Sequence, residues 1–284
     1  MLKKQRHAPL FAQKSLYLSR RILKKMEIDA RIDDLLTNLK PITLDEMKEI
    51  RLMNRTDTKF VTNKETLARL LELAQGKYYA QFHNGSKIAN YMTTYWDTDA
   101  HKFYMEHHNG RSPRQKVRVR TYMDSDDTFL EIKTKNNHGR TKKKRVSVPS
   151  QQITGENGNE EFLQERVHLS LTDIHPTVRN QFHRITLVNY GKTERLTIDY
   201  DVQFHNMETD KEANVGPLVI IELKRDGNVF SPVLDILRQL RIKPCGFSKY
   251  CIGTVMTNKE LKHNRFNMRM ITLGKLAGQK LQTY

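Results

Sequence analysis

The stretch Lys116–Lys135, KVRVRTYMDSDDTFLEIKTK, has the pattern of two short strands on either side of an acidic turn. Successive side chains of a strand point to opposite faces, so Val117, Val119 and Ile132 share one face. A half-buried strand normally turns its polar face to bulk water, so a whole face of charges on two adjacent strands requires a reason. That face carries mostly one sign of charge: Arg118, Arg120, Glu131, Lys133 and Lys135.

The same alternation recurs in two later segments. In RLTIDY (195–200), Arg195, Thr197 and Asp199 alternate with apolar residues. In VIIELK (219–224), Glu222 and Lys224 share a face with an isoleucine. The segment KKKR (142–145) is basic on both faces.

Two arrangements satisfy these patterns. In the first, the charged faces are the solvated side of an open sheet. In the second, the sheet closes into a barrel, with apolar faces outward under helices and charged faces lining a lumen. Like charges opposite each other across strands are destabilising, so such a lumen needs a polyanion or interleaved carboxylates.

The composition is that of a soluble globular protein, with 284 residues of which 37% are hydrophobic and 29% charged. The sequence contains no run of about 18 apolar residues, so we expect no membrane span. Two cysteines, Cys245 and Cys251, are too few for a disulfide framework, which favours a reducing cytoplasm.

The first 25 residues contain eight Lys or Arg and no Asp or Glu, and they lack the apolar core of a secretion signal. They fit either an arm for nucleic acid or a membrane surface, or a dispensable extension. The net charge of +17 makes the rest of the chain basic as well. We therefore expect a basic extension over residues 1–25 and a single domain over 26–284.

Periodicity and turn residues predict the secondary structure. Apolar spacing predicts a helix that ends before Pro41, and Thr43 with Glu46 forms the pattern of a capping box. Asn63 fits as the cap of the next helix. Asn84-Gly85 predicts a hairpin between strands at 77–83 and 87–98. Further strands are expected near 116–123, 128–135, 142–148, 184–190, 195–205 and 217–224, and helices at 231–240 and within 247–277.

Ten short segments occur in a characteristic order: RTDTKF (55–60), YWDT (95–98), HHNGR (107–111), KVRVR (116–120), FLEIKTK (129–135), KKKR (142–145), FHR (182–184), RLTIDYD (195–201), IIELK (220–224) and GFSKY (246–250). Over about residues 51–255 they resemble the VTC domain, the polyphosphate polymerase domain of the triphosphate tunnel metalloenzyme superfamily. The resemblance implies an α+β fold, in which an antiparallel closed β-barrel forms the triphosphate tunnel and helices surround it. Tyr95 and Asp97 match positions that organise this tunnel.

The resemblance also implies which cations contact phosphate. Arg grips phosphate oxygens in a bidentate manner, and Lys acts as a point charge. Lys249, in GFSKY, resembles the family's tunnel lysine, which is expected to act on the chain end. Arg195 and Lys224 are added on spacing and face alone. The phosphate or nucleotide contacts implied by the resemblance are Lys59, Arg111, Arg118, Arg120, Lys133, Lys144 and Arg184.

A divalent metal is expected to assist transfer, and hard oxygen ligands suit Mn²⁺ or Mg²⁺. Glu222 matches the family's metal carboxylate. Glu131 and Asp199 share the charged faces and fit equally well as further metal ligands or as salt-bridge partners. Phe129 stands where the hydrolytic branches of the superfamily carry the first of two glutamates, which favours transfer over hydrolysis.

The expected function is transfer of the ATP γ-phosphate onto inorganic polyphosphate. The alternatives are a tripolyphosphate or nucleoside triphosphate hydrolase, and a non-catalytic polyanion-binding protein. The chain lacks the stacking platforms and groove-reading motifs of nucleic-acid modules, which argues against a nucleic-acid partner. Export of a product would require a separate membrane protein as partner of this cytoplasmic chain.

Overall fold

The structure is a computed structural model that describes residues 10–48, 50, 55–137, 140–156, 158–227 and 229–281. Its helices are α1 (Leu10–Thr37), α2 (Leu44–Lys48), α3 (Lys64–Ala74), α4 (Lys102–His108), α5 (Asn159–Val167), α6 (Pro232–Gln239), α7 (Lys249–Thr257) and α8 (Asn267–Ala277), with short 3₁₀ turns at Leu171–Asp173 and Asn264–Phe266. Its strands are β1 (Lys40–Ile42), β2 (Arg55–Asn63), β3 (Tyr78–Gln81), β4 (Ile88–Asp97), β5 (Arg114–Tyr122), β6 (Asp127–Lys135), β7 (Thr141–Ser147), β8 (His175–Asn189), β9 (Glu194–Asn206), β10 (Glu212–Asn214) and β11 (Leu218–Asp226).

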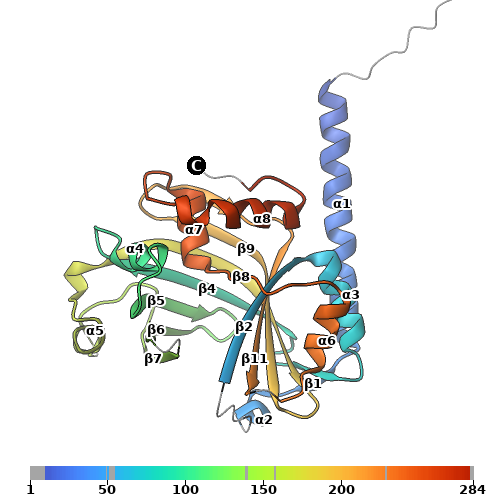
Figure 1. Ribbon diagram of the computed structural model, residues 1–284, viewed down its shortest axis with the longest axis horizontal. Helices are drawn as coiled ribbons and strands as arrows, with labels where there is room; N and C mark the ends of the chain where they lie inside the picture. Colours follow the sequence, from blue (N-terminus) through green and yellow to red (C-terminus); the bar gives the residue numbers. More distant parts are fainter. Residues whose placement is uncertain are drawn as a thin grey trace, which may run out of the picture.

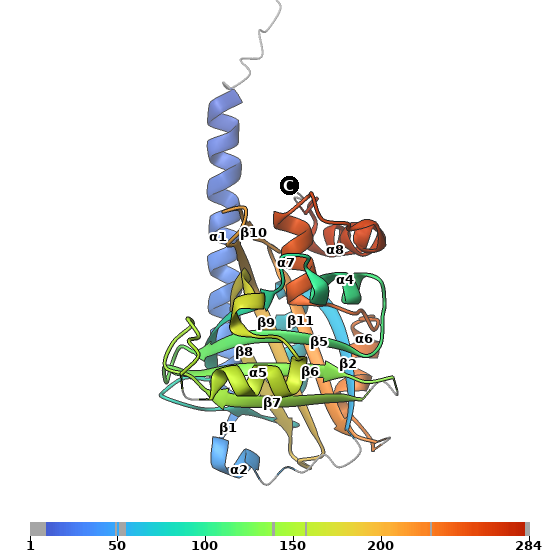
Figure 2. The same cartoon turned by 90° about the vertical axis from the view of Figure 1, so that its left-hand side faces the viewer.

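One sheet dominates the molecule, with the strand order β2-β11-β9-β8-β4-β5-β6-β7. All neighbours along this order are antiparallel, and among the described strands only the side pair β1–β3 is parallel. The sheet curls strongly, so that β2 and β7 rise on either side of a concave face (Figures 1 and 2). The predicted α+β class is therefore confirmed.

The predicted closure of the barrel is wrong for the strands that the structure describes. β2 pairs with β11 and β7 pairs with β6, but β2 and β7 do not pair with each other, so the sheet is a half-barrel. The sequence of β7 offers a physical reason, because Lys142, Lys143, Lys144 and Arg145 follow one another. Lysine-rich edge strands resist pairing with a further strand.

Helices cover the apolar, convex side of the sheet. α3 and α6 pack there through residues such as Leu70 and Val233, which belong to one core cluster with Ile198 and Ile221 of the sheet. A second cluster joins Leu163 of α5 to the apolar residues of β5 and β6. The sheet thus shares one feature with the second arrangement derived from the strand patterns, apolar faces under helices and charged faces on the concave side, although it does not close.

Two local predictions about helix starts are confirmed. Glu46 accepts a hydrogen bond from the backbone N–H of Thr43 at 2.7 Å, and the Thr43 hydroxyl accepts one from Glu46 N at 3.3 Å, which is a capping box. Asn63 caps α3 by accepting from Thr66 N at 3.0 Å.

The predicted hairpin between β3 and β4 is wrong, although its turn exists. Asn84 and Gly85 have the positive φ of such a turn, at 47° and 79°, but only His83 and Ser86 pair across it. The two strands instead pair one after the other along β8, which at 15 residues is long enough for both. A partner distant in sequence thus outcompetes the local one.

Helix α1 runs without a break from Leu10 to Thr37, through the boundary at Met26 that the sequence suggests. Its C-terminal end is capped by Lys87, whose Nζ donates to the carbonyl oxygens of Leu36 and Leu39 at 2.8 and 2.7 Å. Within the described ranges, no helix has the length and apolarity needed to cross a membrane. The division into an extension and one domain stays a prediction.

Candidate functional site

Charged side chains from seven strands, β2, β5, β6, β7, β8, β9 and β11, meet on the concave face of the sheet. The register of β5, β6 and β7 places Lys116 opposite Lys133 and Lys133 opposite Lys143. On the other wall, Lys59 of β2 lies opposite Glu222 of β11. These pairs are close because residues directly across an antiparallel pair have Cβ atoms about 4.5–5.5 Å apart.

The first carboxylate of this face is Glu131, which is fully buried in β6. Arg118 donates to its Oε2 from Nη2 at 2.6 Å and from Nε at 2.8 Å, and Lys143 Nζ donates to its Oε1 at 2.9 Å. Burial alone would raise the pKa of Glu131, but Arg118, Arg120 and Lys143 hold it well below its usual range. Glu131 is therefore ionised and holds the side chains of Arg118 and Lys143 in position.

The second carboxylate is Glu222 on β11. Lys59 Nζ lies 2.6 Å from its Oε1, and Lys224 Nζ lies 3.2 Å from its Oε2. Burial opposes ionisation, yet the surrounding lysines hold the pKa of Glu222 far below its usual range. Burial lowers the pKa of the neighbouring Lys133 to about 7, and Lys59 contributes to this shift.

The third carboxylate is Asp199 on β9, which connects the sheet to helix α7. Arg184 grips it through two hydrogen bonds, from Nε at 2.6 Å and from Nη2 at 2.8 Å, and Lys249 Nζ donates to its Oδ2. Lys249 Nζ also lies 4.0 Å from the centre of the Phe182 ring. Burial lowers the pKa of Lys249 to about 8, although Asp199 counteracts this shift.

Helix α7 explains why Lys249 reaches the sheet. Ser248 caps the helix by accepting from Cys251 N at 3.3 Å, which makes Lys249 its first residue. Lys116 of β5 donates to the same serine hydroxyl at 2.8 Å. The N-terminus of α7 is thereby fixed over the floor of the half-barrel.

Cations outnumber carboxylates on this face, and the pKa of Tyr95 reflects this excess of positive charge. Burial by itself would raise the pKa of the Tyr95 hydroxyl, but the adjacent Arg118, Lys116 and Arg120 lower it. Arg120 itself has a lowered pKa, because it is buried and lies near Arg118. The face therefore has the electrostatic character of an anion-binding surface, with three interleaved carboxylates that keep it stable without a ligand.

The structure brings most of the predicted residues together. The register also places Arg195 on this face, opposite Lys224, and its Nη2 donates to Met47 O at 3.4 Å. The predicted residues found on the concave face are Lys59, Arg118, Arg120, Lys133, Arg184, Arg195, Lys224, Lys249, Glu131, Asp199 and Glu222.

Two predicted phosphate contacts lie elsewhere. Lys144 pairs with Ile132 and thus belongs to the apolar, convex face, so its expected place in the lumen is wrong. Arg111 is exposed in the loop after α4, where Arg114 Nη1 donates to its carbonyl oxygen at 3.2 Å. The structure therefore does not support a role for Arg111 through contact with the three carboxylates.

The sequence patterns left out cations that the structure adds to this face, among them Lys116 and Lys143. Lys116 shares the alternation of Arg118 and Arg120, and extending that pattern by one step would have found it. Lys143 could not be chosen over Lys144, because β7 is basic on both faces and only the register with β6 separates them. Tyr95 and Asp97, the two positions expected to organise the tunnel, have different roles. Tyr95 lies on the concave face beside Arg118. Asp97 accepts hydrogen bonds from Phe103 N and Tyr104 N at the start of α4, both at 2.9 Å.

This face has no metal site made of protein ligands alone, since no group of three His, Cys, Asp or Glu residues converges among the described residues. A metal that arrives with a triphosphate needs only one or two carboxylates, because phosphates and water supply the other ligands. Glu222 fits this requirement, with 18% of its side chain exposed and both carboxylate oxygens directed at displaceable lysines.

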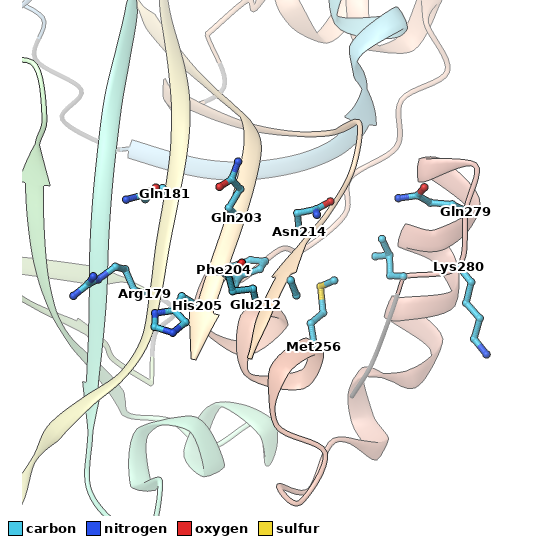
Figure 3. Close-up of a pocket in the computed structure, with 12 residues that line it drawn as sticks. Arg179, Gln181, Gln203, Phe204, His205, Glu212, Asn214, Met256, Gln279 and Lys280 are labelled. Carbon is cyan, nitrogen blue, oxygen red and sulfur yellow. The ribbon is translucent and has the colours of Figure 1, made fainter. Parts of the chain in front are cut away.

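A separate cavity of about 640 Å³ lies away from these residues. Figure 3 shows that β8, β9, β10 and the segment after α8 line it. None of the three carboxylates or their cations lines this cavity, so it is not the phosphate site.

Comparison with solved structures finds distant similarity. A putative adenylate cyclase from Bacillus halodurans matches at 15% identity with a TM-score of 0.45, over 76% of this chain and 100% of that one. A putative adenylyl cyclase from Hippeastrum, described as having a dominant triphosphatase activity, matches at 13% identity with a TM-score of 0.47, over 71% of this chain and 95% of that one. The Schizosaccharomyces pombe RNA triphosphatase matches at 10% identity with a TM-score of 0.28, over 86% and 96%.

Scores this low carry no conclusion about the site. A comparison with curated protein sequences found no match. The model of the VTC domain family, in contrast, matches residues 54–258 and so covers well over half of the sequence. That range includes every residue of the three carboxylate clusters. The chain belongs to the VTC domain family.

Proposed function

We propose that this protein is a polyphosphate polymerase, which transfers the γ-phosphate of ATP to the end of an inorganic polyphosphate chain on the concave face. One observation carries the proposal: in a member of the VTC family, three carboxylates each hold two cations on a face that keeps further cations beside them. An incoming phosphate chain offers these cations stronger and more numerous oxygen partners than the carboxylates do.

The proposed reaction is an in-line displacement. A terminal oxygen of the polyphosphate attacks the γ-phosphorus of ATP, and the bond from that phosphorus to the β–γ bridging oxygen breaks. The electron pair of that bond leaves with ADP, and the polyphosphate grows by one unit. Such a transfer needs positioning and charge neutralisation more than covalent help from the protein.

The side chains of the face divide these tasks. Arg118 and Arg184 present planar guanidinium groups that suit bidentate contact with phosphate oxygens. Lys116, Lys133 and Lys143 line the β5–β7 wall as point charges along the chain. Lys249, fixed at the start of α7, is a cation aimed at the floor, where it orients the attacking phosphate or stabilises the leaving one.

We further propose that Glu222 holds one Mn²⁺ or Mg²⁺ ion together with phosphate oxygens of ATP. The ion would neutralise negative charge on those oxygens when bound. Lys59 and Lys224 would then exchange Glu222 for phosphate oxygens. The two free cysteines, Cys245 and Cys251, agree with a reducing cytoplasm as the place of the reaction.

The hydrolase alternative is opposed by Phe129. Its register places it on the concave face opposite Arg120, where a hydrolytic relative would carry a second carboxylate beside Glu131. Arg145 instead lies 4.1 Å above its ring. Fewer carboxylates leave fewer bases to activate water, which favours a phosphate as the acceptor.

The test incubates the purified protein with ATP and Mn²⁺ and resolves the products on a gel stained for polyphosphate. We expect long chains from the wild type, about 100-fold less from Lys249→Ala, and wild-type amounts from the convex-face control Lys144→Ala. Free phosphate without chains would assign the protein to the hydrolases. Tight polyphosphate binding without turnover would leave a binding protein.

A further inference from the structure

A row of aromatic side chains crosses the concave face, next to the cations of the proposed phosphate site. Tyr122 of β5 lies opposite Tyr91 of β4, and Tyr91 lies opposite Phe182 of β8. The ring centroids of these pairs are 5.0 and 5.3 Å apart, and the ring of Phe129 on β6 meets that of Tyr122 edge-on at 5.9 Å. These four residues, the aromatic row, come from four strands, so no single segment of the sequence shows them together.

The two ends of the aromatic row differ in exposure. Tyr91 and Phe182, toward β8, are buried, and Lys249 Nζ lies 4.0 Å from the centre of the Phe182 ring. Tyr122 and Phe129, toward β6, are only half-buried. The β8 end of the row therefore supports a cation of the site, whereas the β6 end leaves aromatic surface that the protein does not fully cover.

Arg145 of β7 lies over this open end of the row. Its guanidinium carbon is 4.1 Å from the centre of the Phe129 ring, and its Nη1 is 3.5 Å from the Tyr122 hydroxyl. Glu131, which lies opposite Arg145 in the register, is held by other cations, so within the described part of the chain Arg145 has no carboxylate partner. An exposed guanidinium plane that is not fixed by a carboxylate can move aside and admit a flat group above the ring.

The open end of the row adjoins the phosphate-binding cations. Phe129 lies directly across from Arg120, and Glu131 with its cations follows two residues later on the same face of β6. Alternate positions of a strand are about 6.6–6.8 Å apart. A ligand that joins a flat ring to a phosphate chain through a short linker can therefore stack at Phe129 while its phosphates contact Arg118 and Arg120.

We propose that the open end of the aromatic row, Tyr122 and Phe129 with Arg145, binds the base of a nucleoside triphosphate. The base stacks on the Phe129 ring, and the guanidinium of Arg145 closes over its other face. The phosphates then run along β5 and β6 toward Lys116 and Lys133. The base site rests on the proposed function only in that ATP is the ligand of the concave face.

Stacking distinguishes a nucleotide from the polymer that it would extend. Inorganic polyphosphate and tripolyphosphate have no flat group, so they use the cations and leave the aromatic surface in water. Every base has a π-face, and stacking alone therefore predicts similar affinities for ATP and GTP. The row thus selects nucleoside triphosphates over inorganic phosphates without selecting the base.

The test titrates the full chain with ATP and, separately, with inorganic tripolyphosphate, both in EDTA so that no turnover interferes. We expect Phe129→Ala to weaken ATP binding by about tenfold or more and tripolyphosphate binding by less than about twofold. Phe129→Leu keeps the apolar volume without the ring, and it should show the same selective loss even if Phe129→Ala does not fold. The control Phe230→Ala removes an aromatic side chain outside the row that is 73% exposed, and it should bind both ligands as the wild type does.

The two ligands separate the base site from the polymerase proposal. Equal loss of ATP and tripolyphosphate binding in the Phe129 variants would overturn the base site, as would unchanged ATP binding. A wild type that binds neither ligand would overturn the base site and the proposed function together. ATP binding that depends on the Phe129 ring, in a protein that makes no polyphosphate, would support the base site and overturn only the polymerase.

Discussion

Lys64 and Lys249 are both buried beside aspartates, but the ratio of cations to carboxylates differs between the two clusters. Lys64, with 3% of its side chain exposed, bridges Asp29 of α1 at 2.5 Å and Asp201 at 2.8 Å. Lys249, with 12% exposed, shares the single carboxylate of Asp199 with Arg184. One cation satisfies two carboxylates in the first cluster, whereas two cations divide one carboxylate in the second.

An excess of carboxylates over cations indicates a structural ion pair, whereas an excess of cations over carboxylates indicates a surface that binds an anion. The cluster around Lys64 is completed by its own chain and joins α1, α3 and β9. The cluster around Lys249 keeps a surplus of positive charge in a place where burial already disfavours it, as the lowered pKa of Lys249 records. An anion from outside would neutralise this surplus, and we propose that phosphate is that anion.

The largest expected effect on stability is that of Lys64→Met. The substitution leaves Asp29 and Asp201 without their cation and should lower the free energy of unfolding by about 2–3 kcal/mol, below the full penalty of a broken buried pair because Asp29 is 35% exposed. The melting temperature should fall by about 5–10 °C. Chain synthesis per folded molecule should stay at the wild-type rate, and its loss without destabilisation would contradict the structural role.

A smaller effect separates the two faces of β7. Lys143→Ala removes a cation that contacts Glu131 and should weaken polyphosphate binding by about fivefold to tenfold, whereas Lys144→Ala on the convex face should leave it unchanged. Both lysines are neighbours on an exposed strand, so the pair is closely matched. Titration of each variant with a polyphosphate of fixed length measures the dissociation constants, and a reversed order would show that the β7 register is misassigned.

Asp199→Asn tests whether Asp199 positions Lys249 or binds metal. Asp199 raises the pKa of Lys249 against the effect of burial, so its neutralisation should lower that pKa below about 8. The alkaline limb of the kcat/KM profile should then move to lower pH, by about one unit. An unchanged limb with a raised Mn²⁺ requirement would identify Asp199 as a metal ligand.

The smallest effect is uptake of protons on binding. The pKa of Lys133 is lowered to about 7, so this amine is only partly protonated at neutral pH, and a bound phosphate chain should raise that pKa again. Calorimetric titration at pH 7 in buffers of different ionisation enthalpy should show uptake of less than about one proton. The variant Lys133→Met should lose most of it, and equal uptake by wild type and variant would assign the proton elsewhere.

How much the sequence could predict depends on the range of the interactions involved. Alternation along single strands correctly assigned Arg118, Glu131, Asp199 and Glu222 to one face, because that property is local. The choice between Lys143 and Lys144 required the register of β7 against β6. Closure of the barrel depended on whether two edge strands far apart in sequence would pair.

The Asn84-Gly85 turn is a second case in which a local pattern does not determine which strands pair. Its residues correctly predicted a turn with positive φ, but the strands that flank it pair with β8, whose second half comes more than 90 residues later. The clusters around the three carboxylates likewise combine residues from distant strands. Their membership became visible only when the strand order was known.

The most direct test of the central claim is Lys249→Met, measured for both product and stability. Asp199 keeps Arg184 as its partner in this variant, and the buried charge of Lys249 is removed. At pH 7, below the lowered pKa of about 8, the native state carries the destabilising effect of that buried charge, and this effect decreases as the pH rises from that pKa toward the ordinary lysine value. We predict a melting temperature equal to or above that of the wild type, and about 100-fold less polyphosphate from ATP, as for Lys249→Ala. A melting temperature that falls as in Lys64→Met, with chains still made by the folded fraction, would contradict the claim that surplus charge on the concave face serves phosphate.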